Sequence, residues 1–347
     1  MHLLGMKKLK NIVFFLLILG CKSENIFENS ITFESFPKKE KLKPKFLHKM
    51  EDIAVDGLLA YNDSTLLIRH KANSSKYHFS TFDINKKLIT TNLLEAGSGQ
   101  NQSMAFLSYG VMDNEVWVFD IVKNELITTR IDTNVTANDL LSRSESNFYY
   151  NIQPINDSIY LGSGDYDSDF RFSFVNLRNN EVVKRVARYP KNISRAQKNS
   201  YESFLFINPS RDKAVLAGRY TDMVQVLNLE NDESVIHKGP EDLTNYYDVM
   251  VRGDGKEISV RNDRTRYAFV KGATTNNFIY LLYSGNIHNG SNLYYGKEVF
   301  VYDWQGKPIK KLILPDYILD IAISSDDSII YTYNPKTGSI EFSNLEL

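Results

Sequence analysis

Three aspartates at alternate positions have the spacing that most resembles a metal site. Asp165, Asp167 and Asp169, in the stretch GSGDYDSDF, match the first three ligand positions of a calcium-binding loop. Such a loop also needs a glycine directly after the third aspartate and a glutamate at the twelfth position, where this chain has Asn176. Because both are missing, we interpret the stretch as an acidic turn between strands and expect no metal there.

Residues for nucleophilic or metal chemistry are scarce elsewhere. The six histidines show no ligand spacing, since even His70 and His78 are eight residues apart. The chain has no Gly-x-Ser-x-Gly motif, and Cys21 is its only cysteine. A Ser-His-Asp triad whose members meet only in space stays open. We expect no cofactor.

Paired tyrosines recur at residues 149–150, 246–247 and 294–295. Aromatic rings with a polar tip suit sugar or peptide recognition at a rim, which makes Tyr247 a candidate binding residue. Neighbouring residues of a strand point to opposite faces, however, so packing accounts for about half of these tyrosines.

Cys21 directly follows an apolar run near the N-terminus. A basic stretch at residues 7–10 precedes IVFFLLIL at residues 12–19, which is shorter than the roughly 20 apolar residues that span a bilayer. The sequence ILGC at residues 18–21 resembles the lipobox of bacterial lipoproteins, in which the cysteine thiol is lipidated and cleavage falls before it. The resemblance implies a signal peptide over residues 1–20 and a lipid anchor on Cys21. The alternative is an ordinary buried cysteine behind a signal peptide.

The segment after this cysteine predicts where the protein lies. Residues 21–45 are polar and rich in lysine, which indicates a tether between the lipid and the folded part. Lys22 stands where an aspartate would signal retention in the inner membrane, so we expect the bacterial outer membrane, with the periplasmic or surface face left open. No second cysteine is present to form a disulfide in an oxidising compartment.

Composition favours strands and gives no sign of nucleic-acid binding. The net charge of −1 provides no basic surface for phosphates. The 21 tyrosines and 20 phenylalanines, against 9 prolines, suit strands. Apart from a short helical turn within residues 190–200, we expect an all-β chain.

Two patterns recur six times between residue 46 and residue 347. One is an apolar strand that ends in Asp or Asn before a polar turn and a second apolar run, and its polar residues are Asp83, Asp120, Asn176, Asn228, Asp303 and Asn334. The other is a pair of strands joined by an Asp or Asn turn, and its turn residues are Asp63, Asn114, Asp157, Asp212, Asn277 and Asp327. Six such units of about 50 residues predict a six-bladed β-propeller over residues 46–347.

The last repeat shows how the ring would close. It ends at the C-terminus with SIEFSNLEL as its third evident strand, so one strand is missing. A strand from the other end of the chain would complete this blade and remove an open edge. Residues 30–36 or 45–50 are the candidates for this closing N-terminal strand.

With this organisation the chain resembles the TolB-like six-bladed β-propeller lipoproteins of Bacteroidetes-type bacteria. The match is strongest in FIYLLYSG (278–285), EVFVYDWQGKPIKKLIL (298–314) and ILDIAISSDDSIIYTYNP (318–335). The stretch GSGQNQ at residues 97–102 lies where the family tends to carry Gly-x-Gly-Pro-x-Glu. The resemblance implies a fold and a location much more than an activity.

Some six-bladed propellers are lactonase-like enzymes that hold a divalent metal on the axis with residues from the ends of the inner strands. The residues that enter the expected inner strands here are Gln102, Asn147, Tyr201, Arg264 and Asp316. Only Asp316 is a strong ligand for a hard metal. We therefore expect a binding or scaffold module for an envelope protein, glycan or peptide, with a metal-dependent hydrolase or lactonase as the alternative.

Three turns carry a sequence that could be modified. Asp-Ser followed by Thr or Ile occurs at Ser64, Ser158 and Ser328, and it resembles the O-glycosylation signal of exported proteins in such bacteria. Exposed turn tips would admit a glycan with little loss of packing. The alternative is that Asp-Ser is simply favourable turn chemistry.

Overall fold

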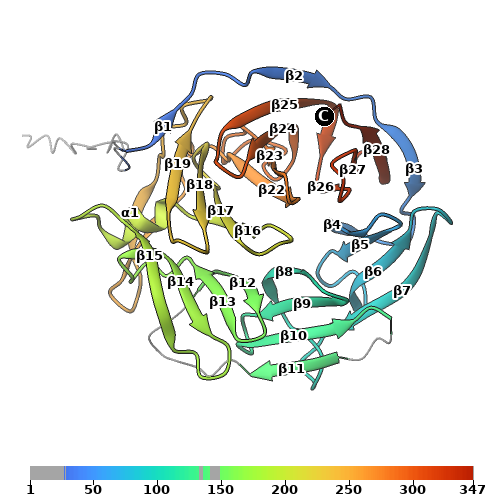
Figure 1. Cartoon of the computed structure of the whole chain (residues 1–347), viewed down its shortest axis with the longest axis horizontal. Helices are drawn as coiled ribbons and strands as arrows, with labels where there is room; N and C mark the ends of the chain where they lie inside the picture. Colours follow the sequence, from blue (N-terminus) through green and yellow to red (C-terminus); the bar gives the residue numbers. More distant parts are fainter. Residues whose placement is uncertain (1–26, 28, 133–135, 141–148, 347) are drawn as a thin grey trace, which may run out of the picture.

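Six mainly antiparallel sheets stand around a central axis and form a closed ring (Figure 1). The computed structural model describes residues 27, 29–132, 136–140 and 149–346. The prediction of an all-β six-bladed propeller is confirmed. Within each blade the first strand lies next to the axis and the following strands lie progressively further out.

The first three blades are built from consecutive strands. Blade 1 contains β4 (Val55–Asn62), β5 (Thr65–His70), β6 (Tyr77–Asp83) and β7 (Leu88–Glu95). Blade 2 contains β8 (Phe106–Met112), β9 (Glu115–Asp120), β10 (Glu125–Arg130) and β11 (Thr136–Leu140). Blade 3 contains β12 (Asn151–Asn156), β13 (Ile159–Ser163), β14 (Phe170–Asn176) and β15 (Val182–Arg188).

The last three blades each take a strand from the N-terminal segment. Blade 4 contains β16 (Ser203–Ile207), β17 (Lys213–Gly218), β18 (Met223–Asn228) and β19 (Ser234–Lys238). Blade 5 contains β22 (Phe269–Thr274), β23 (Phe278–Tyr283), β24 (Gly296–Asp303) and β25 (Pro308–Ile318). Blade 6 contains β26 (Asp320–Ile323), β27 (Ile329–Asn334) and β28 (Ser339–Asn344).

The N-terminal strands run along the outer edge of these three blades (Figure 1). β1 (Ile31–Thr32) pairs in parallel with β19, and β2 (Lys38–Lys41) pairs in parallel with β25. β3 (Lys45–Lys49) pairs antiparallel with β28 and becomes the fourth strand of blade 6. Closure of the ring by an N-terminal strand is therefore confirmed, and residues 45–49 provide it.

Strands β1 and β2 lie inside the segment that the sequence indicated as a tether. Phe36 is buried in the core between blades 4 and 5 and Leu42 in the core between blades 5 and 6, and the Phe36 ring lies 4.8 Å from Phe300 and 5.4 Å from Tyr302. Further upstream, Phe27 is only 7% exposed. The folded part thus begins near Phe27 instead of at residue 46, because apolar side chains at intervals bind this polar segment to the ring.

The two repeated patterns mark different kinds of turn. All six residues of the second pattern lie in or beside the turn between the first and second strands of their blades. In the first pattern, four residues end a third strand, whereas Asp120 and Asn334 end a second strand. Asp and Asn accept nearby backbone N–H groups in both settings, as Asp83 does from Lys86 and Asp120 from Val122. Because Asp and Asn stabilise the turn after a second strand as well as after a third strand, the first pattern does not mark the same strand in every blade.

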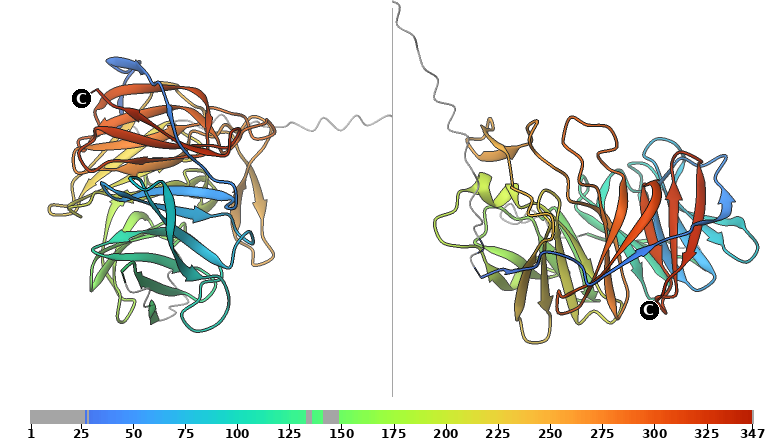
Figure 2. Two further views of the ribbon diagram at one scale, coloured as in Figure 1. Left: turned by 90° about the vertical axis from the view of Figure 1, so that its right-hand side faces the viewer. Right: turned by 90° about the horizontal axis from the view of Figure 1, so that it is seen from above.

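One hairpin projects from the ring. β20 (Asp248–Val251) and β21 (Glu257–Val260) lie in the connection between the outermost strand of blade 4 and the innermost strand of blade 5. Because strands alternate in direction, this connection and the turns between first and second strands lie on opposite faces of the ring. Figure 2 shows the hairpin standing out from one face. The helix α1 (Arg195–Ser200), capped by Ser194, packs against β21 and confirms the expected helical turn.

Candidate functional site: the central cavity

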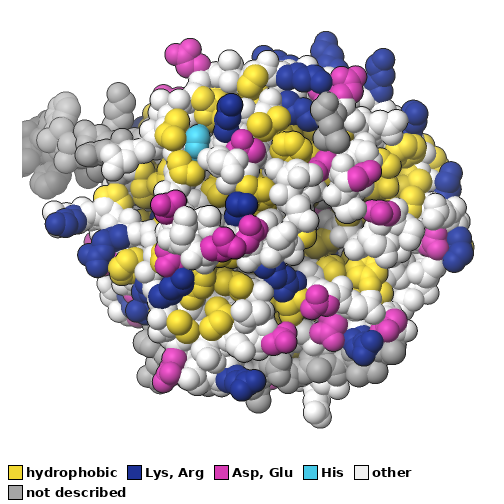
Figure 3. Space-filling view, viewed as in Figure 1, with side chains coloured by type: hydrophobic (Ala, Val, Ile, Leu, Met, Phe, Trp, Pro, Cys, Tyr) yellow, Lys and Arg dark blue, Asp and Glu magenta, His cyan; other side chains and the backbone are white. Residues whose placement is uncertain are grey.

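The innermost strands of all six blades surround a cavity of about 340 Å³ on the axis. This volume is at the small end of the range for ligand pockets. Figure 3 shows one face of the ring with a hollow near its centre and with acidic and basic side chains interspersed around it. The charged side chains that line the cavity are Arg69, Arg211, Lys271 and Asp320.

Two ion pairs lie together where β4, β22 and β26 begin. Lys271 Nζ donates to the Asp56 carbonyl oxygen at 2.8 Å and lies 3.5 Å from Asp320 Oδ2. Arg69 Nε lies 3.3 Å from Asp56 Oδ2. The Arg69 guanidinium also stacks over the rings of Phe106 and Tyr109, at 4.8 and 4.7 Å from their centres.

Asp320 is held almost entirely out of water. It is 2% exposed, and its carboxylate accepts the backbone N–H of Leu58 at 3.0 Å and of Ile321 at 2.8 Å. A Cβ at Gly57 would lie 3.0 Å from Asp320 Oδ2, so the chain approaches the carboxylate this closely only because residue 57 is glycine. Burial alone would lower the pKa of Lys271, but the carboxylates of Asp320 and Asp56, together with Tyr109, outweigh it and raise the pKa. The ammonium therefore stays charged inside the ring.

Arg211 lies toward the opposite end of the cavity. It belongs to the turn between the first two strands of blade 4, where its φ of 57° is in the left-handed region. Burial lowers its pKa, and the nearby carboxylates of Asp113 and Asp157 raise it in part. Within the described part of the chain, no side chain forms an ion pair or hydrogen bond with the Arg211 guanidinium. Of the three cations that line the cavity, Arg211 is the one for which the described residues provide no ion pair.

None of the described residues that the sequence suggested for the axis lines this cavity. Gln102 closes its own loop by accepting from the Gly99 N–H and donating to Glu95, and Tyr201 is buried against Phe27, with the rings 5.2 Å apart. These residues precede the inner strands, as the sequence suggested, whereas the cavity is lined mainly from within those strands, so a binding role for them stays a prediction.

The other suggested residues lie outside the cavity lining. Arg264 stacks over Tyr246 at 4.7 Å, Tyr247 is half-buried in the loop before β20, and Asp316 on β25 lies 3.9 Å from Lys336. Asn147 lies outside the described residues. A binding role at the rim stays a prediction for these residues.

Sequence reasoning missed Arg69, Arg211 and Lys271. Arg69 and Lys271 stand inside apolar strands, TLLIRH and FVKGAT, where a lone cation among apolar residues was the available signal. Arg211 directly precedes Asp212, a turn residue of the second repeated pattern. The pattern could therefore have placed Arg211 in the turn after an innermost strand.

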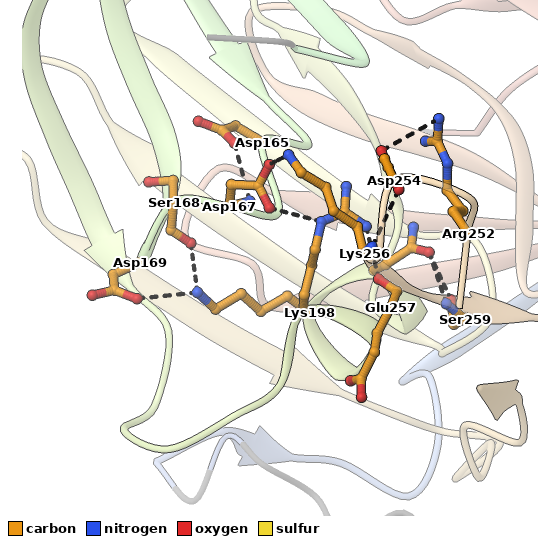
Figure 4. Close-up of polar contacts among 12 residues, drawn as sticks. Asp165, Asp167, Ser168, Asp169, Lys198, Arg252, Asp254, Lys256, Glu257 and Ser259 are labelled. Carbon is orange, nitrogen blue, oxygen red and sulfur yellow. Dashed lines mark hydrogen bonds and ion pairs between the residues drawn. The ribbon is translucent and has the colours of Figure 1, made fainter. Parts of the chain in front are cut away.

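The acidic turn forms ion pairs with protein cations (Figure 4). Asp167 lies 2.7 Å from Arg195 Nε and 2.5 Å from Lys256 Nζ, and Asp169 lies 3.0 Å from Lys198 Nζ. Asp165 accepts the backbone N–H of Asp167. The turn connects blade 3 to α1 and to the projecting hairpin, which is a structural role for these carboxylates.

The described residues contain neither a candidate metal cluster nor a candidate membrane-spanning helix. Within residues 27, 29–132, 136–140 and 149–346, no three His, Cys, Asp or Glu side chains gather around a possible metal position. In the same part of the chain, no helix has the length and apolar character needed to cross a bilayer.

The three serines of the suggested modification signal lie in turns on the face opposite the hairpin. Each is half-buried, and Ser64 Oγ and Ser328 Oγ donate to Asn62 and Asp326, at 3.0 and 2.7 Å. The Ser158 N–H is bonded to Asn156 Oδ1. These contacts agree with a role in the turns, and glycosylation stays a prediction.

The fold and the cavity define a six-bladed propeller with a charged axis. The chain belongs to the TolB-like six-blade propeller family, whose model matches residues 52–326. A comparison with curated proteins found no match. Among solved structures, a DUF4221 family member from Bacteroides vulgatus is similar at a TM-score of 0.59 and 14% identity, over 89% of this chain and 99% of that chain. The Cps50 (Swd1) propeller domain of Myceliophteria thermophila is similar at a TM-score of 0.48 and 9% identity, over 88% of this chain and 100% of that chain. At these identities the likeness concerns the fold alone.

Proposed function

We propose that the protein is a lipid-anchored binding module of the bacterial outer membrane, whose central cavity takes an acidic group of an envelope peptide or glycan. The observation that carries this proposal is a cavity lined by all six blades in which the other charges are paired and Arg211 is left without an ion pair.

The size and charge of the cavity define the ligand class. A volume of about 340 Å³ holds one sugar or one or two peptide residues, and not a folded partner. A guanidinium binds carboxylates through two parallel hydrogen bonds, and partial burial strengthens this interaction relative to water. The ligand we propose is therefore the carboxylate end of a peptide or an acidic sugar.

Matched pairs of small molecules test the ligand class. Titration calorimetry would compare galacturonic acid with galactose, and a tripeptide that has a free C-terminus with the same tripeptide as its amide. We expect binding of the acid in at least one pair, no binding of its neutral partner, and loss of binding in Arg211→Gln. Equal binding of acid and neutral partner, or binding unchanged in Arg211→Gln, would contradict the proposed ligand class. The control is Arg252→Gln on the projecting hairpin, which leaves the cavity intact.

The anchor rests on the lipobox-like ILGC sequence. Two or more acyl chains hold a protein on a membrane stably, whereas a single chain is marginal. We expect metabolic labelling with a palmitate analogue in the natural chain and none in Cys21→Ser, which should leave the membrane fraction. Labelling that persists in Cys21→Ser would refute the anchor.

We also propose O-glycosylation at Ser64, Ser158 and Ser328, supported by their Asp-Ser sequences and their common face. The intact mass of protein from its native host should exceed the mass of the lipidated polypeptide by whole glycan units. A mass equal to that of the lipidated polypeptide would leave these serines as turn residues.

A further inference from the structure

We infer that the β20–β21 hairpin is a membrane-contact element that rests on the bilayer interface and sets which face of the ring points toward the lipid. This inference rests on the proposed lipid anchor at Cys21. It concerns a surface that the cavity does not use, because the hairpin contributes no lining residue.

β20 exposes an apolar row that stands apart from the rest of the described surface. Its residues Val249, Met250 and Val251 are 55%, 47% and 63% exposed. Side chains alternate along a strand, so both faces of the hairpin carry apolar groups. The other large exposed apolar residues of the described chain do not form such a run of three. A contiguous apolar element of this kind on a protein surface indicates an interaction site.

The hairpin is held in a fixed position. Arg195 Nη1 donates to the Glu257 carbonyl oxygen at 2.8 Å, and the Ser259 N–H and Oγ both bond Asn199 Oδ1 at 3.0 Å. Lys256 binds Asp167, as Figure 4 shows. Because these contacts join the hairpin to α1 and blade 3, the apolar row is presented as a rigid edge, and little conformational entropy is lost when it meets a surface.

The anchor would keep this edge close to the bilayer. The Phe27 ring packs 5.2 Å from Tyr201, the residue that directly follows α1, and Figure 1 shows β1 and α1 on the same flank of the ring. Six residue steps separate Phe27 from Cys21, which allows at most about 20 Å of chain. Such a short connection gives the membrane a high effective concentration at the hairpin, so a modest apolar surface is enough for contact.

The charges and the backbone of the hairpin define the mode of contact. Arg252 lies 3.8 Å from Asp254, and Lys256 is paired with Asp167, so the tip has no excess of basic charge for anionic lipids. In the described structure β20 pairs only with β21, which leaves one backbone edge unpaired. Water at the interface can satisfy this edge, whereas hydrocarbon cannot, so the strand lies among the headgroups.

Introduced cysteines test the contact, because lipidation of Cys21 leaves no other thiol. The lipidated full-length protein would carry Met250→Cys or, as control, Leu88→Cys, each labelled with an environment-sensitive fluorophore. Leu88 is 43% exposed, close to the 47% of Met250, and begins β7 at a turn on the opposite face. In phosphatidylcholine vesicles we expect a blue shift and about a twofold or larger rise in emission at residue 250 only, with quenching by spin-labelled lipid. The signal should be unchanged by added phosphatidylglycerol.

Each other outcome has a definite meaning. A protein that floats with the vesicles but shows no shift at residue 250, or equal shifts at both positions, refutes the contact and leaves the anchor intact. Shielding of residue 250 only after envelope proteins are added refutes the membrane as occupant and assigns the edge of β20 to a partner strand. A protein that does not float refutes the anchor, and with it the hairpin contact. Val249→Thr with Val251→Thr, which keep the strand propensity, should halve the shift or reduce it further.

Discussion

Blades 1–3 and blades 4–6 differ in the strand that forms their outermost edge. Blades 1–3 end in their own fourth strands, whereas blades 4–6 are covered by β1, β2 and β3 from the N-terminal segment. This segment joins the three blades as one continuous band (Figure 1). The polar, lysine-rich segment is therefore part of the fold and contacts half of the ring.

Removal of residues 22–50 should have the largest effect. The deletion takes away Phe27, Phe36, Leu42, Leu47 and Met50, all of them buried. Each such loss costs about 2–5 kcal/mol, so the five together are comparable to or larger than the 5–15 kcal/mol by which a typical domain is stable. We expect aggregation or a large loss of melting temperature by calorimetry. A truncated chain that melts where the mature chain does would mean that the band is only a tether.

The band contains one buried and one exposed phenylalanine, whose substitutions should have different effects on stability. Phe36 is 5% exposed among Phe300 and Tyr302, whereas Phe46 on β3 is 64% exposed. Phe36→Ala should lower the free energy of unfolding by about 3–5 kcal/mol, and Phe46→Ala by less than about 0.5 kcal/mol. Denaturant unfolding measures both. Similar values for the two variants would show that Phe36 is not packed as described.

The ion pairs on the axis should matter next. Lys271→Met leaves Asp320 buried without its cation and should cost about 3 kcal/mol. Adding Asp320→Asn removes the buried charge but keeps an acceptor for only one of the Leu58 and Ile321 N–H groups, so the double variant should regain part of this loss. A double-mutant cycle measures the coupling. Additive losses would mean that the two side chains do not form a pair.

The smallest effect concerns the attachment of the hairpin. Hydrogen bonds from Lys256 and Arg195 hold the pKa of Asp167 below its usual range, against the effect of burial. A depressed folded-state pKa contributes stability above the unfolded value of about 4, and this contribution is lost as pH falls through the folded value. Asp167→Asn should therefore have a lower melting temperature than the natural chain at pH 7, and the lost stability should be at most about 1 kcal/mol per exposed pair. This difference in melting temperature should disappear below about pH 4. A gap that does not change with pH would contradict this role of Asp167.

The sequence predicted the ring but not its axis. Asp and Asn turns between first and second strands recur in all six blades, and this regularity fixed the blade number. Arg69 and Lys271 were missed because each is a single cation inside an otherwise apolar strand, and the sequence of such a strand does not show that its side chain reaches the axis. In the band, β3 was predicted, whereas the pairing of β1 and β2 with blades 4 and 5 was missed, because β1 has two residues and because parallel pairing to β19 and β25 leaves no hairpin turn in the sequence.

Hydrogen exchange of the mature lipidated protein tests the band most directly. Amides of β1–β3 that bond to β19, β25 and β28 should exchange far more slowly than those of an unstructured chain. The protection of β3 should be similar to that of β28, because β3 is the fourth strand of the same blade. If residues 30–49 instead exchange at the rate of a free peptide while β19, β25 and β28 stay protected, the N-terminal segment does not close the ring.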